Sequence, residues 1–122
     1  MKLNTLLLLA ALNWVFFGLG ALITPAYVIP DNSGNELALI LVRHMGSGAV
    51  VLGLLAWFTR TLPDTDARRL IISIIFLAFA LDGLINVMGI IGGVLPSSDW
   101  IFASIDILFS LGFGYFRFIK PE

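Results

Sequence analysis

Four long apolar runs, separated by short polar segments, dominate the pattern of hydrophobic and polar positions along the chain. About 20 apolar residues in a helix, rising 1.5 Å each, cross the roughly 30 Å hydrocarbon core of a bilayer. The pattern therefore predicts an all-α integral membrane protein, a four-helix bundle that forms one domain over residues 1–122. The predicted spans are residues 3–24, 36–59, 70–92 and 100–116.

Prolines and turn-forming residues fill the segments between the spans. Residues 24–35 carry two prolines and a glycine, which predicts a loop. Ser33 and Glu36 have the spacing of a capping box at the start of the second span. Pro63 follows the end of that span, and Asp64 is in position to cap the third helix.

The positive charges show an asymmetry between the loops. The N-terminus, the middle loop and the C-terminus hold Lys or Arg, whereas the loops around Asp31 and Asp99 hold neither. Since loops rich in Lys and Arg stay in the cytoplasm, both termini are predicted to be cytoplasmic. The residues that carry this signal are Lys2, Arg60, Arg68, Arg69, Arg117 and Lys120.

Composition supports the membrane class and narrows the possible partners. Hydrophobic residues make up 59% of the chain and charged residues 12%, with a mean hydropathy of +1.01. Soluble domains are usually about 45–50% apolar. A net charge of −1 excludes nucleic acid as an expected partner. The sequence contains no cysteine, so disulfides and thiolate metal sites are excluded.

A few ionisable residues lie inside the apolar runs. Arg43 is in the second span, where a charged side chain costs at least roughly 2.5–3.5 kcal/mol on insertion scales. Asp82 and Asp106, in the third and fourth spans, are candidate partners. Counting 1.5 Å per residue from the ends of the spans places Arg43, Asp82, Asn86 and Asp106 in the outer half of the bilayer. We expect these groups to face one another or a wet cavity.

Three spans each present a polar pair spaced four residues apart, which places both members on one helix face. The pairs are Arg43 with Ser47, Asp82 with Asn86, and Asp106 with Ser110. Two interpretations stay open: a structural lock in which Arg43 bridges the aspartates, or a working binding site. His44 lies about 100° around the helix from Arg43, and one histidine does not complete a metal site. The sequence assigns no metal, catalytic residue or cofactor.

Two stretches of the chain resemble a known family. LNWVFFGLGALITP in the first span and LVRHMGSGAVVLGLLAWFTR in the second, followed by two further apolar spans, resemble the small four-helix bacterial membrane proteins grouped as DoxX-like. The resemblance covers nearly the whole chain and rests on glycines, Arg43 and the spacing of the spans. It implies a four-helix bundle in the bacterial inner membrane. The family's name derives from a subunit of a quinone-reducing oxidoreductase, which implies a quinone-related role.

Three classes of function are compatible with these features, and we rank them as follows. First is a structural or accessory membrane subunit, whose partners are the lipid bilayer and a second copy or another membrane protein. Second is a binder or proton-coupled transporter of a small apolar molecule, such as a lipid or a quinone-like compound. Third is a membrane enzyme that uses His44 and the carboxylates as acid and base, and the sequence favours a non-enzymatic role over it.

Overall fold

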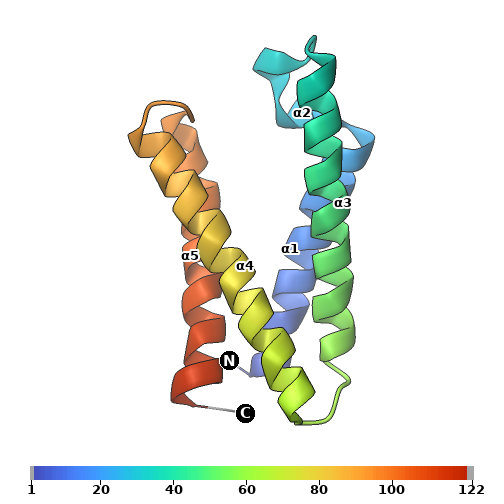
Figure 1. Cartoon of the computed structure of the whole chain (residues 1–122), viewed down its shortest axis with the longest axis vertical. Helices are drawn as coiled ribbons and strands as arrows, with labels where there is room; N and C mark the ends of the chain where they lie inside the picture. Colours follow the sequence, from blue (N-terminus) through green and yellow to red (C-terminus); the bar gives the residue numbers. More distant parts are fainter. Residues whose placement is uncertain (1, 121–122) are drawn as a thin grey trace. The chain divides into compact units, whose positions relative to one another are not determined.

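The structure is a computed structural model, which describes residues 2–120, and every regular element in that range is helical. The α-helices are α1 (Leu3–Ile23), α2 (Pro25–Val28), α3 (Glu36–Thr59), α4 (Asp66–Ile91) and α5 (Trp100–Gly114), shown in Figure 1. Short 3₁₀ turns cover Pro30–Asn32 and Ser97–Asp99, and α5 continues into a π-helical turn at Tyr115–Ile119. Four helical segments are long and apolar enough to cross a membrane, which confirms the all-α prediction with four candidate spans.

The boundaries of the spans follow the prediction with one clear exception. The helix predicted over residues 36–59 has those bounds, and α1 ends one residue before the predicted end. However, the helix α4 begins at Asp66, four residues before the start of the predicted apolar span at residue 70 and close to the predicted cap at Asp64. The helix is longer than the span because hydropathy marks only the part of a helix that hydrocarbon can cover, and the first turn of α4 is polar. The segment predicted as a loop over residues 24–35 contains α2.

Both predicted helix caps were off by one position or more. Asn35 caps α3, where its Oδ1 accepts a hydrogen bond from the amide of Ala38 at 3.1 Å. Thr65 caps α4, where its Oγ1 accepts from the amide of Arg68 at 3.3 Å. The capping residue directly precedes the first helical residue. The predicted caps from Ser33 and Asp64 are therefore wrong.

The chain divides into two compact units, which are described separately. One unit comprises residues 7–61 and contains most of α1 together with α2 and α3. The other comprises residues 2–6 and 62–120 and contains α4 and α5. The expectation of one four-span bundle stays a prediction.

In the first unit, α1 and α3 touch backbone to backbone at glycines. A Cβ atom added at Gly18 would lie 2.7 Å from the carbonyl oxygen of Gly46 and 2.8 Å from the amide nitrogen of Val50. About two turns beyond Gly46 on α3, a Cβ at Gly53 would lie 2.7 Å from Cγ2 of Val15 on α1. Small residues let membrane helices approach this closely, and van der Waals contact then holds them together.

In the second unit, α4 and α5 pack through three phenylalanines. The ring centroids of Phe79 and Phe109 are 4.6 Å apart, and those of Phe79 and Phe113 are 5.9 Å apart. The planes in each pair are nearly parallel, so the three rings form a continuous stack. Phe79 and Phe113 have no exposed surface. This stack is the apolar core on which the polar residues of the same two helices are placed.

Candidate functional site

A polar cluster lies on α4 and α5 directly beyond the phenylalanine stack. We call Asp82, Asn86 and Asp106 the carboxylate–amide cluster. Asn86 donates from Nδ2 to Oδ2 of Asp106 at 2.9 Å, which joins the two helices. Gly83 makes the approach possible, because a Cβ at that position would lie 3.3 Å from Cβ of Asp106.

Helical spacing explains why these side chains meet. Asp82 follows Phe79 by three residues on α4, and Asp106 precedes Phe109 by three residues on α5. Residues three or four apart share a helix face, so Asn86 and Asp106 lie in the same interface as the stack, and Asp82 lies at its exposed edge. Asp82 lies nine residues before the end of α4, which corresponds to about 14 Å along the helix. If α4 spans a bilayer, the cluster lies well inside the hydrocarbon.

Asp82 differs from its neighbours in the cluster. Its side chain is exposed on its own unit, whereas Asn86 and Asp106 are half-buried. Among the described residues of that unit, no hydrogen bond or ion pair to the Asp82 carboxyl is found. The cluster thus consists of one amide–carboxyl hydrogen bond and a second carboxyl at its exposed edge.

The remaining predicted site residues are placed elsewhere. Ser110 lies one turn beyond Asp106 on α5 and is half-buried. Arg43, His44 and Ser47 lie on α3 in the other unit, and each is exposed there. The structure therefore brings together three of the seven predicted residues, and the predicted bridge from Arg43 to the aspartates stays a prediction. In the described part of the chain, no three His, Asp or Glu side chains are grouped to hold a metal ion.

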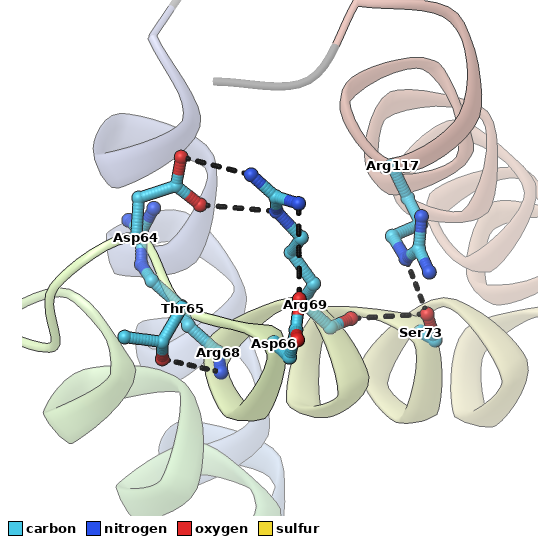
Figure 2. A network of polar contacts seen from close by, with 7 residues as sticks. All are labelled: Asp64, Thr65, Asp66, Arg68, Arg69, Ser73 and Arg117. Carbon is cyan, nitrogen blue, oxygen red and sulfur yellow. Dashed lines mark hydrogen bonds and ion pairs between the residues drawn. The ribbon is translucent and has the colours of Figure 1, made fainter.

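A second polar network in the same unit joins the loop before α4, the first turns of α4 and the helical turn that follows α5. Figure 2 shows these contacts. The guanidinium of Arg69 donates to both carboxylate oxygens of Asp64, at 3.2 and 3.3 Å. Nε of Arg117 donates to Oγ of Ser73 at 2.7 Å, and Ser73 donates in turn to the carbonyl oxygen of Arg69 at 3.0 Å. The hydrogen bond from Arg69 holds the pKa of the Asp64 carboxyl below its usual value.

Arg68 is the member of this region that the sequence analysis missed. It is buried, and its Nη2 donates to Oδ1 of Asn4 at 2.8 Å, which ties the start of α1 to the start of α4. A periodic signal was available in the sequence. Arg68 begins the buried face of α4, which continues at the helical spacing through Ile72, Ile75, Phe79 and Gly83. The topology rule accounts for a positive charge at Arg68 but predicts no partner for it.

Comparison with known proteins adds no assignment. No family model, curated protein or solved structure matches the chain. The resemblance to the DoxX-like proteins therefore stays a prediction, and the site has to be interpreted from its own geometry.

Proposed function

We propose that the chain is a small integral membrane protein of the bacterial inner membrane that acts as a structural or accessory subunit. Its four long apolar helices cross the bilayer, with both termini in the cytoplasm. The carboxylate–amide cluster supplies the polar contact through which this subunit holds a neighbouring membrane helix. The order of the spans and the distribution of Lys and Arg support this topology.

The observation that carries the proposal is the contrast between Asp106 and Asp82. Asp106 is held by Asn86 at 2.9 Å between α4 and α5, which is a packing contact and needs no further ligand. Asp82 is exposed on the same unit at membrane depth. Ionisable side chains inside a membrane face protein or a wet cavity, because hydrocarbon cannot solvate them. The outward carboxyl of Asp82 therefore supports a role in contact with another polar group of a protein.

The second candidate is a binder or proton-coupled transporter of a small apolar molecule, such as a lipid or a quinone-like compound. The same exposed carboxyl favours it, because a carboxyl beside a half-buried one can take up and release a proton as a ligand binds. The two functions differ in what lies against Asp82. A subunit has a protein there, and a binder has a small molecule.

Photo-crosslinking in native membranes separates these functions. A photoreactive residue is placed at position 85, which lies three residues from Asp82 on a neighbouring face of α4, or at position 84, which lies about 160° around the helix from Asp82. Ile85 and Leu84 are both exposed in the wild-type chain, so position 84 is a matched control for position 85. We expect one discrete protein adduct from position 85 and only lipid adducts from position 84.

The dependence on Asp82 decides the outcome. The variant Asp82→Leu should reduce the protein adduct at position 85 by as much as tenfold, because the loss of one polar contact of about 1.4 kcal/mol lowers the association constant by that factor. Lipid adducts alone at both positions, or a protein adduct that Asp82→Leu leaves unchanged, would contradict the subunit role. Native mass spectrometry that finds a small apolar molecule in the parent but not in Asp82→Leu would favour the binder.

A further inference from the structure

Two contacts hold the side chain of Arg117, which lies near the end of the last helix. Its Nε donates to Oγ of Ser73 on α4 at 2.7 Å, and its guanidinium lies 5.3 Å from the ring centre of Phe118. Ser73 is itself fixed, because it donates to the carbonyl oxygen of Arg69 at 3.0 Å. Figure 2 shows the Arg117 side chain turned toward Ser73. The guanidinium is therefore held in one orientation before any ligand binds.

Arg117 lies in the π-helical turn at Tyr115–Ile119. A π-helical turn contains an additional residue per turn and changes the direction in which the following side chains project, and such turns are frequent at functional sites. Phe118, in the same turn, packs edge to face on Phe76 of α4 with ring centroids 5.5 Å apart. The polar contact of Arg117 and the aromatic contact of Phe118 thus dock the turn on α4 at two adjacent points.

Nε is the nitrogen of Arg117 that donates the hydrogen bond to Ser73, and the ring of Phe118 lies beside the guanidinium carbon. Among the described residues, no acceptor is found for the two terminal nitrogens, Nη1 and Nη2. Arg69 differs, because its guanidinium is already occupied by Asp64. The terminal nitrogens of Arg117 present parallel N–H groups whose spacing fits two oxygens of a phosphate.

The surroundings of Arg117 combine positive charge with exposed apolar surface. The hydrogen bonds from Arg68 to Asn4 and from Arg117 to Ser73 bring the start of α1, the first turns of α4 and the end of the last helix together. At this end of the unit, basic residues outnumber acidic ones by five to two. The basic residues are Lys2, Arg68, Arg69, Arg117 and Lys120, and the acidic ones are Asp64 and Asp66. Phe118 is 62% exposed and Ile119 is 74% exposed beside the guanidinium.

We propose that Arg117, Ser73 and Phe118 form a binding site for the phosphate of an anionic phospholipid. The terminal nitrogens of Arg117 bind two phosphate oxygens, Ser73 keeps the guanidinium in place, and the acyl chains lie along the exposed aromatic and aliphatic side chains of the turn. Charge selects an anionic headgroup over a zwitterionic one. The apolar surface distinguishes a lipid from free phosphate, which has nothing to bury there.

Native mass spectrometry of the detergent-solubilised chain with added phosphatidylglycerol tests the site. We expect phosphatidylglycerol to bind about tenfold more tightly than phosphatidylcholine, and Arg117→Gln to remove that preference. The matched control is Arg60→Gln, which removes the same charge from the other unit. One surface charge is worth about 1 kcal/mol of general attraction to anionic lipid, so the control should weaken binding no more than about fivefold.

Two further variants separate the site from general charge and from loss of fold. Arg117→Lys keeps the charge but loses the paired donors, and Ser73→Ala keeps the guanidinium but removes its support. Both should retain the helical circular dichroism of the parent and bind phosphatidylglycerol severalfold more weakly, and they carry the test if Arg117→Gln does not fold. Equal binding in Arg117→Gln and Arg60→Gln, or wild-type binding in Ser73→Ala and Arg117→Lys, would overturn the proposal. Displacement of the lipid by millimolar glycerol phosphate would overturn the lipid as ligand and assign the site to free phosphate.

Discussion

Replacement of Gly46 by alanine is expected to destabilise the packing of α1 on α3 by about 1–3 kcal/mol, the usual cost of overpacking a close interface. The added Cβ would lie 2.7 Å from the carbonyl oxygen of Gly18 and 2.8 Å from Cβ of Ala21. Neither atom can move without the backbone of α1, so the two helices have to separate. Small residues allow van der Waals contact between closely packed helices, and this substitution removes that contact at its closest point.

The matched control for this substitution is Gly48→Ala, two residues along the same helix. A Cβ at Gly48 meets no atom within 4 Å. Alanine is also the better helix former by about 1 kcal/mol, so this variant should be as stable as the parent or more so. Unfolding by sodium dodecyl sulfate, followed through the intrinsic tryptophan fluorescence of the chain, measures both variants. Equal unfolding midpoints for the two would show that α1 and α3 do not pack through Gly46.

A second large effect is expected from Phe79→Ala, in the unit that carries the carboxylate–amide cluster. Phe79 has no exposed surface and stacks on Phe109 with a centroid distance of 4.6 Å. Truncation of a buried phenylalanine costs about 3–5 kcal/mol in packed cores. Lipid solvates apolar side chains as well as a protein core does, so the cavity accounts for the loss, and we expect about 3 kcal/mol, the lower end of that range.

Phe102→Ala is the corresponding control on α5. Its side chain is 53% exposed, so its removal should change the free energy of unfolding by no more than about 0.5 kcal/mol. The same detergent titration, followed through the near-ultraviolet circular dichroism, compares the two variants. If Phe79→Ala unfolds together with Phe102→Ala, the stack does not support the interface on which Asp82 and Asp106 lie.

The sequence allowed the fold class and part of the polar cluster to be predicted, for identifiable reasons. The bounds of α3 were predictable for two reasons. The apolar run has the length needed to cross a bilayer, and it lies between a polar start and Pro63, which a helix does not readily continue through. Asn86 and Asp106 were predictable as neighbours, because helical spacing and depth each restrict where a polar side chain can lie.

Other features depend on information that hydropathy does not contain. The first turn of α4 is polar, so no hydrophobic period marks its start, and the contacts of Arg68 with Asn4 follow from that turn. The contact of Arg117 with Ser73 depends on a π-helical turn, which breaks the period of 3.6 residues on which face assignments rest. Charges at the ends of spans satisfy the topology rule whatever they touch, so their individual partners cannot be deduced from it.

Single-cysteine labelling in intact cells tests the proposed membrane topology most directly, because the native chain has no cysteine. The variants Ser33→Cys and Ser98→Cys place a thiol in the two loops proposed to lie outside, and Asp64→Cys places one in the middle loop. A membrane-impermeant maleimide should label positions 33 and 98 in intact cells, and position 64 only after the membrane is opened. Labelling of position 64 in intact cells, or protection of positions 33 and 98, would contradict a four-span protein with both termini in the cytoplasm.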